Sequence, residues 1–247
     1  MSRTFDMLHI DQHVATEPPA AHVERVEQNE TVKQRNGHGV MEDEVMKLVQ
    51  QIFILPESAQ SPGAVTFCGV DEGAGCSRVC AQAAKMLAEH SPGTVCIVEA
   101  NLRTPSLGQY FGIGECPGFA EAMKETRPIR EFAQRIAGSN LWLITAGAIG
   151  GEPNGALNPA RLRARFSELR GEYNHVVMDT PPASAHPDAL LLAQLTDGVV
   201  LVVGSNTTRR ETARIAKESF KASRVPILGA VLNNRTYPIP RALYARL

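Results

Sequence analysis

AVTFCGVDEGAGCS, residues 64–77, is the most informative stretch of the sequence. Its first six residues are apolar and β-rich, and the glycine-rich turn that follows leads into a helical pattern over residues 77–90. Such a turn lets backbone N–H groups converge on an anion at the positive end of a helix dipole. The stretch therefore predicts a phosphate-binding loop at residues 69–77, with the Ser77 hydroxyl placed where it would meet Mg²⁺.

The loop departs from the common pattern G-x-x-x-x-G-K-[ST] at two positions, because Val70 stands at the first glycine and Cys76 at the lysine. A charge pair about 4 Å apart contributes about 4 kcal/mol at intermediate dielectric, and a thiol cannot replace the lysine's charge. Arg78 lies two positions further along the helix and points to another face. Two interpretations stay open: a turn that binds nothing, and a loop that keeps residual nucleotide binding through its backbone.

The rest of the chain alternates short apolar runs with helical patterns. Strands that are buried on both faces have this composition, because helices cover both sides of a parallel sheet. We therefore expect an α/β fold of the P-loop NTPase type, with a doubly wound, mainly parallel sheet and helices on both faces. The expected strands cover residues 64–69, 94–99, 141–145, 175–179, 198–203 and 227–233, and the longer helices cover residues 77–90, 159–172 and 208–223.

Composition divides the chain into a leader and one domain. Residues 1–40 carry Pro18, Pro19 and many Glu, Gln, His and Asn with little apolar periodicity, which is typical of a mostly disordered segment. Residues 41–247 form the expected domain, which begins with an amphipathic helix ending before Pro56. The apolar positions of this helix repeat every three to four residues at Val45, Leu48, Val49, Ile52 and Phe53.

The composition excludes several classes of protein. The formal net charge is −1 and no basic stripe is visible, so we expect no nucleic-acid partner. No apolar run approaches the ~20 residues of a membrane span and the polar start is unlike a secretory signal, so we expect a cytoplasmic protein without direct membrane insertion. Five cysteines without an export signal favour reduced thiols over disulfides, and we expect no zinc site.

Two further polar segments follow apolar strands. EANLRTP (residues 99–105) comes after the second expected strand, and DTPP (residues 179–182) comes after the fourth. An aspartate at the end of a buried strand suits the Walker B role, in which it holds Mg²⁺ or a water on that ion. Three such segments in this order are a more specific signal than the loop alone.

In order and spacing these segments resemble the bacterial tyrosine kinases (BY-kinases) of capsule and exopolysaccharide synthesis, over residues 41–247. EGAGCS (residues 72–77) is similar to the family's P-G-E-G-K-S, EANLRTP to D-x-D-L-R-x-P, and DTPP matches fully. The remaining likeness lies in Asp188-Ala189, Asn158-Pro159 and residues 197–203 and 228–233.

The resemblance implies ATP and Mg²⁺ as ligands and assigns roles to single residues. Glu99 takes the place of the family's base, and Asp179 that of the acid which, with Ser77, holds the metal. Glu99 is one methylene longer than the family's aspartate, and Asn101 is a neutral amide that cannot take up a proton. The expected nucleotide contacts are Gly73, Ala74, Gly75, Cys76, Ser77 and Arg103.

An intact scaffold with an altered loop leads to the main hypothesis, a catalytically impaired BY-kinase-like subunit of exopolysaccharide or capsule production that acts by docking. By resemblance its partner is a membrane-embedded polysaccharide co-polymerase or a kinase paralogue, which would hold it at the inner membrane. Homo-oligomers are a further expectation. The family's E-x-x-R-x-x-R motif falls on Glu44, Lys47 and Gln50, and the tail carries only Tyr237 and Tyr244 in place of a tyrosine-rich cluster.

Two alternatives to this hypothesis remain. The first is an active ATPase or tyrosine autokinase in which another group, contributed across a dimer, meets the phosphate charge. The second is a redox sensor centred on Cys76, whose pKa a helix N-terminus would lower. His175 and His186 flank the DTPP segment, but without a visible acid partner we interpret them as structural.

Overall fold

The computed structural model describes residues 44–54, 61–148 and 158–234, all of which belong to the compact unit Glu42–Leu247. The expected leader, residues 1–40, and the two tail tyrosines lie outside the described residues. In the described part no helix is long and apolar enough to cross a membrane.

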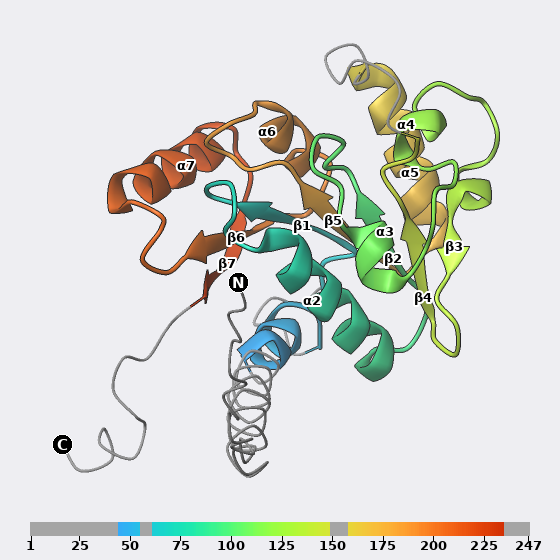
Figure 1. Cartoon of the computed structure of the whole chain (residues 1–247), viewed down its shortest axis with the longest axis horizontal. Helices are drawn as coiled ribbons and strands as arrows, with labels where there is room; N and C mark the ends of the chain where they lie inside the picture. Colours follow the sequence, from blue (N-terminus) through green and yellow to red (C-terminus); the bar gives the residue numbers. More distant parts are fainter. Residues whose placement is uncertain (1–43, 55–60, 149–157, 235–247) are drawn as a thin grey trace, which may run out of the picture. The chain divides into compact units, whose positions relative to one another are not determined.

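The described domain contains one seven-stranded sheet in the order β3-β4-β2-β5-β1-β6-β7 (Figure 1). All neighbouring strands run parallel except β3 and β4, which are antiparallel. This confirms the mainly parallel sheet. The strands are β1 (Ala64–Gly69), β2 (Val95–Glu99), β3 (Gln134–Arg135), β4 (Leu141–Ile144), β5 (His175–Thr180), β6 (Val199–Gly204) and β7 (Ile227–Asn233).

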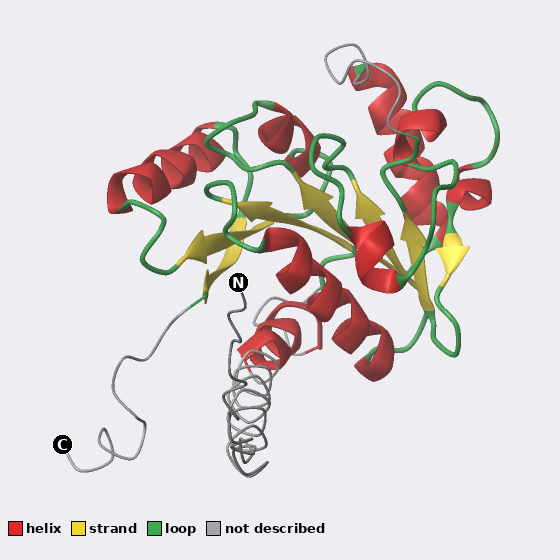
Figure 2. Cartoon of the chain, viewed as in Figure 1, coloured by secondary structure: helices red, strands yellow, loops and turns green. Residues whose placement is uncertain are grey.

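Helices cover both faces of the sheet, which confirms the doubly wound arrangement. Figure 2 shows α2 on one face and α6 and α7 on the other. The helical elements are η1 (Gln50–Ile54), α2 (Cys76–His90), α3 (Leu107–Phe111), α4 (Phe119–Ala122), η2 (Ile129–Phe132), α5 (Pro159–Glu172), α6 (Asp188–Ala193) and α7 (Arg210–Ala222).

The inner strands β1 and β2 consist mostly of apolar residues. All residues of β1 and β2 are buried, because each strand has helices above and below it. Phe67 and Ile97 are fully buried, and each contributes roughly 1.5–3 kcal/mol of hydrophobic stabilisation. The strand β7 differs because it lies at the sheet edge and is largely half-buried or exposed.

The amphipathic helix expected after Met41 is present in the described range 44–54, α-helical to Val49 and then continuing as η1. Its five apolar positions are all buried, as the periodicity predicts. Leu48 lies so close to Gly229 of β7 that a Cβ there would be 3.1 Å from it. On the exposed face, Lys47 pairs with Glu44 at 3.0 Å.

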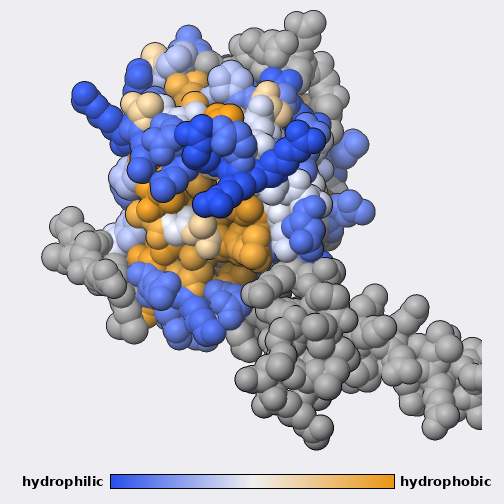
Figure 3. Space-filling model, turned by 90° about the vertical axis from the view of Figure 1, so that its left-hand side faces the viewer, coloured by the Kyte–Doolittle hydropathy of each residue, from blue (hydrophilic) through white to orange (hydrophobic). Residues whose placement is uncertain are grey.

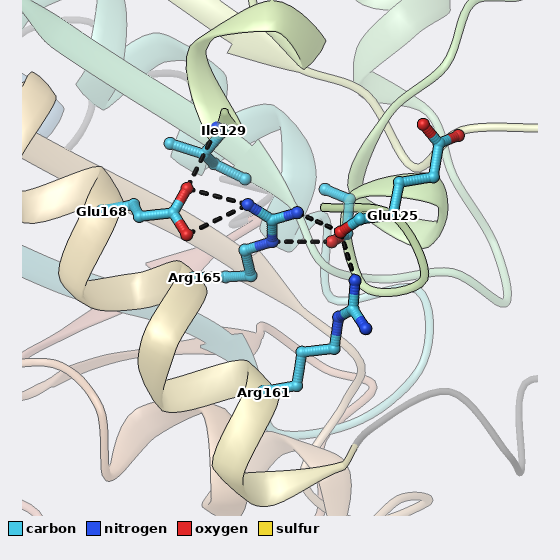
Figure 4. A network of polar contacts seen from close by, with 6 residues as sticks. Glu125, Ile129, Arg161, Arg165 and Glu168 are labelled. Atoms are coloured by element: carbon cyan, nitrogen blue, oxygen red, sulfur yellow. Dashed lines mark hydrogen bonds and ion pairs between the residues drawn. The ribbon is translucent and has the colours of Figure 1, made fainter. Parts of the chain in front are cut away.

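Arg165 of α5 is a buried cation that connects this helix to the α4 and η2 segments (Figure 4). Its Nε donates to the Ala122 carbonyl at 2.8 Å, and its Nη1 contacts Glu168 at 2.8 Å. Glu168 in turn accepts the Ile129 N–H at 3.1 Å, and the Glu125 carbonyl accepts hydrogen bonds from both Arg161 and Arg165. The network fixes short elements that have little propensity of their own.

Candidate phosphate-binding site

The order of the strands brings the three sequence motifs together at one edge of the sheet. β5 lies between β1 and β2, so Asp179 has Phe67 on one side and Glu99 on the other in the strand register. The Ala100 N–H donates to the Asp179 carbonyl at 2.9 Å, which continues the pairing past the end of β2. Ligands bind at the carboxyl ends of strands in such sheets, so this edge is the candidate site.

The loop after β1 turns through two glycines and leads directly into α2. Gly73 and Gly75 have φ angles of 73° and 76°, a left-handed conformation that glycine adopts without strain. α2 begins at Cys76, and its N-terminus has no side-chain cap. The first N–H groups of a helix have no partner within the helix, so those of Cys76 and Ser77 can bind an anion.

Asn233 supports this loop from the far end of β7, a role that our sequence analysis missed. Its Nδ2 donates to the Ala74 carbonyl at 2.9 Å, and the side chain lies against Gly75, where a Cβ would collide with it. Its own carbonyl accepts the Ser205 N–H at 2.7 Å. The sequence feature that could have predicted this role is the position of Asn233, a polar residue at the carboxyl end of an expected parallel strand.

Asp179 is a buried carboxylate at the centre of the site. The residue is 1% exposed, and neither carboxylate oxygen has a hydrogen-bond partner among the residues that the structure describes. Burial raises its pKa to about 7, and the charge of Glu99 adds to the effect. The Ser77 hydroxyl and the Cys76 thiol lower the pKa, although neither reaches hydrogen-bonding geometry with the carboxylate.

Two unpaired oxygens beside a serine hydroxyl fit the donor set of Mg²⁺, which prefers oxygen ligands. Ser77 and Asp179 are therefore the residues that would hold the metal, and the metal would neutralise a carboxylate that is costly to bury as an anion. The loop fits a triphosphate less well, because Cys76 stands at the position where the common motif carries a positively charged lysine.

Cys76 is half-buried at the start of α2. Burial raises the pKa of its thiol well above the ordinary value, and the Asp179 charge raises it further, with Cys80 and Cys68 adding smaller effects. A reactive sensor thiol needs a lowered pKa, so this part of the redox hypothesis is wrong. The helix N-terminus alone does not compensate for burial beside a carboxylate.

Glu99 lies opposite Asp179 but points its carboxylate into backbone donors. One oxygen accepts the N–H groups of Ser106 and of Leu107, the latter at 2.5 Å, and the other accepts the Ala146 N–H at 3.0 Å. The residue is 1% exposed. Both oxygens are engaged in holding the start of α3 and the segment after β4, which is not the arrangement of a base open to a substrate.

The rest of the second motif forms a local turn. Asn101 is buried, and its Oδ1 accepts the N–H groups of Arg103 and Thr104, each at 3.3 Å. Its Nδ2 donates to the Thr104 hydroxyl at 2.9 Å. Arg103, an expected nucleotide contact, lies 3.6 Å from Asp188 of α6. The structure thus joins the second motif to Asp188, which sequence alone left unconnected to it.

His175 does not belong to this site, because it lies at the opposite, amino-terminal end of β5. Its Nε2 is 3.0 Å from the Ser91 hydroxyl and its ring meets Phe53 edge-on, while burial lowers its pKa. These contacts agree with a structural role. Within the described ranges no group of three His, Cys, Asp or Glu side chains could hold a metal ion.

Known proteins with similar sequences are tyrosine kinases. The tyrosine-protein kinase YwqD of Bacillus subtilis is 29% identical over 141 residues, 57% of this chain and 60% of that protein. The tyrosine-protein kinase ptk of Acinetobacter johnsonii is 26% identical over 171 residues, 69% of this chain but 23% of that protein. The chain thus covers less than two thirds of the length of either relative. No protein-family model matches the sequence.

Solved structures give the same result at the level of the fold. The kinase domain of VpsO has a TM-score of 0.71 at 25% identity, over 81% of this chain and 98% of that one. The chimerical protein CapA2B2 has a TM-score of 0.71 at 24% identity, over 79% and 85%. A ParA family ATPase from Chlorobium tepidum is more distant, with a TM-score of 0.59 at 19% identity over 69% and 73%.

The relatives above are described as tyrosine kinases, a solved kinase domain shares the described fold, and the three motifs of this chain meet at the carboxyl ends of its strands. The chain is thus similar in sequence and in fold to the bacterial tyrosine kinase (BY-kinase) family of P-loop proteins.

Proposed function

We propose that this protein is a catalytically impaired BY-kinase-like subunit of exopolysaccharide or capsule biosynthesis, which acts by docking to a polysaccharide co-polymerase or to a kinase paralogue. The observation that carries the proposal is that two groups expected to act on ATP and on a tyrosine are replaced or engaged elsewhere. Cys76 replaces the cation of the loop, and the Glu99 carboxylate is bound to three backbone N–H groups.

The loss of the cation weakens nucleotide binding at its most charged point. The backbone cradle remains, with Gly73 and Gly75 in left-handed conformations, but N–H dipoles alone contribute less than a full charge toward the terminal phosphates. A half-buried thiol with a raised pKa stays neutral at physiological pH. ATP and Mg²⁺ are therefore weak ligands at best under this proposal.

The loss of the base removes proton transfer. Asn101 cannot take up a proton, and its amide is engaged in a turn with Arg103 and Thr104. Glu99 would have to break three hydrogen bonds before it could reach a tyrosine hydroxyl. Each hydrogen bond to a charged group contributes about 1.5–3 kcal/mol, so this rearrangement is costly.

Calorimetric titration of the full chain with ATP and MgCl₂ tests the proposal. We expect no micromolar binding, and we expect the same result with ADP. Micromolar binding that depends on magnesium would overturn the impaired-site proposal. Cys76→Ala is the matched control, because it removes the thiol without adding charge and should behave as the unaltered protein does.

One observation favours a second candidate, an active ATPase or autokinase. Asp179 keeps a buried carboxylate with both oxygens unpaired among the described residues, next to Ser77. A functional magnesium site would look like this. Steady phosphate release that disappears in Asp179→Ala would support that candidate, and absence of release at every protein concentration would remove it.

A further inference from the structure

The two edges of the sheet are built differently. The edge strand β3 has two residues, one of them Arg135, and such short, charged edges resist pairing with another strand. The edge strand β7 has seven residues, ILGAVLN, without a charge or a proline. In the described part of the chain no strand pairs with its outer side. β7 is therefore the sheet edge that is suited to accept a further strand.

The hydrogen-bonding groups of β7 alternate between its neighbour and the open side. The Ser205 N–H donates to the Asn233 carbonyl, and the parallel register pairs Val202 with Val231 and Leu201 with Ala230. In a parallel ladder every second residue bonds to the neighbouring strand. The backbone N–H and C=O groups of the odd-numbered residues from 229 to 233 therefore point toward β6. Those of Ala230 and Leu232 point away from the sheet.

The side chains around this edge are apolar and partly open. Leu232 is 55% exposed, Ala230 is exposed and Leu228 is half-buried. Figure 3 turns the left-hand side of Figure 1 toward the viewer, the side where β7 and α7 lie, and shows an apolar area there, bordered by hydrophilic surface. An exposed apolar surface rimmed by polar residues is typical of an interaction site.

We propose that the β7 edge pairs with the β7 edge of a second copy of this chain, antiparallel and about a two-fold axis through Ala230. The seven-residue strand is self-complementary in that register. Leu228 of one copy lies opposite Leu232 of the other on one face, with Ala230 opposite Ala230 between them. On the other face the small residue Gly229 lies opposite Val231.

Several features of the chain favour a second copy as the occupant. The strand brings no like charges together across the axis, because it has none. The outward N–H and C=O groups of Ala230 pair reciprocally with those of the second Ala230 in an antiparallel ladder, whose pairing is slightly more stable per residue than a parallel one. The two sheets then form one sheet of fourteen strands, with both candidate sites on the same assembly.

Sedimentation equilibrium of the full chain gives the first test. We expect a species of about twice the 26.7 kDa chain mass, and a single-chain mass at every concentration would overturn the proposal. Leu232→Lys places a charge on the edge, and Ala230→Pro removes an outward N–H without touching the ladder to β6. Each should weaken dimerisation roughly tenfold or more.

The control variant is Tyr110→Lys, which adds the same charge at a partly exposed aromatic on α3 and should leave the dimer intact. Circular dichroism establishes that each variant is folded. A dimer that survives both edge variants would place the contact elsewhere and overturn the proposal.

Cross-linking tests the register without disturbing the fold. Residues opposite each other on antiparallel strands have Cβ atoms about 4.5–5.5 Å apart, so Ala230→Cys should form a disulfide between copies under mild oxidation. Tyr110→Cys is the control and should give no dimer band beyond that of the unaltered chain. Equal cross-linking of the two variants, or none in Ala230→Cys, would contradict the two-fold axis at Ala230. Neither result depends on nucleotide, so this proposal can fail while the proposed function stands.

Discussion

Glu99 and Asp179 lie directly opposite each other on the parallel strands β2 and β5, yet their carboxylates have opposite environments. Glu99 is satisfied by three backbone N–H groups, whereas both oxygens of Asp179 lack a partner among the described residues. One acid therefore stabilises the architecture, and the other is left available for a metal ion or a proton.

Cys76→Lys should restore nucleotide binding. The lysine would enter the loop at the position where the common motif carries one, beside the Asp179 carboxylate that now perturbs the thiol. We expect magnesium-dependent ATP binding at least tenfold tighter than in Cys76→Ala, which roughly corresponds to 1.4 kcal/mol or more. Calorimetric titration measures the difference, and equal affinities would show that the pocket has lost its phosphate shape as well as its charge.

Asp179→Asn should change how stability depends on pH. The folded pKa of Asp179 is raised from 3.8 to about 7, so the folded protein keeps a proton that the unfolded chain releases. This contribution to stability is fully present below about pH 4 and is lost as the pH rises through about 7. The variant should therefore gain stability relative to the unaltered chain between pH 5 and pH 8, on the order of 4 kcal/mol at most.

Denaturant unfolding in magnesium-free buffer measures this difference at the two pH values. Asp197→Asn is the control, and its stability difference from the unaltered chain should stay constant between pH 5 and pH 8, because the folded pKa of Asp197 lies below 3.8. Burial alone would raise the pKa of Asp197, but hydrogen bonds from Arg170 and the Ala64 N–H hold it below its usual value. The contribution of Asp197 is present above the unfolded pKa and is lost as the pH falls. A flat difference for Asp179→Asn would show that its carboxylate has an ordinary pKa.

Glu99→Ala should destabilise the domain strongly. The change leaves the N–H groups of Ser106, Leu107 and Ala146 without their acceptor, and a buried unsatisfied donor costs about 1–3 kcal/mol. We expect a loss of roughly 3 kcal/mol in unfolding free energy, whereas Glu115→Ala, at an exposed glutamate, should stay within about 0.5 kcal/mol. A small effect of Glu99→Ala would mean that these bonds contribute little and that the carboxylate can be released.

Gly75→Ala should cost more stability than Gly73→Ala. Both glycines have nearly equal positive φ angles, so both variants incur the same backbone strain of about 1–2 kcal/mol. Only at Gly75 would the new Cβ collide with Asn233, since the space around Gly73 is open. The difference in thermal stability between the two variants measures the cost of the collision, because the backbone strain is the same in both. The double variant Gly75→Ala with Asn233→Ala should recover part of the difference, and no recovery would contradict the contact.

The parallel core was predictable because its determinants are local and regular. Each inner strand is a short, largely apolar run, and the inner strand at residues 64–69 and the edge strand at residues 227–233 both have the bounds that the sequence predicts. From that topology, the convergence of the loop, Glu99 and Asp179 at one edge follows without coordinates. The amphipathic helix before Pro56 was predictable for the same reason, its 3.6-residue period.

The elements between β2 and β4 were not predicted, since contacts distant in sequence fix them. α3 has five residues, and its first N–H groups are held by Glu99, which belongs to the preceding strand. α4 has four residues, and the Arg165 network fixes its carboxyl end. Such short helices have no apolar period to detect. The engagement of Glu99 escaped prediction because its donors come from these segments.

The hydrogen bond from Asn233 to Ala74 closes a separation of 159 residues, from the last described strand back to the loop after the first. A nascent chain emerging from the ribosome can complete β1 and α2 early, but the loop between them lacks this support until β7 has been synthesised and added beside β6. This support of the loop can therefore form only after β7 has been made, and a chain truncated before Ile227 would lack it.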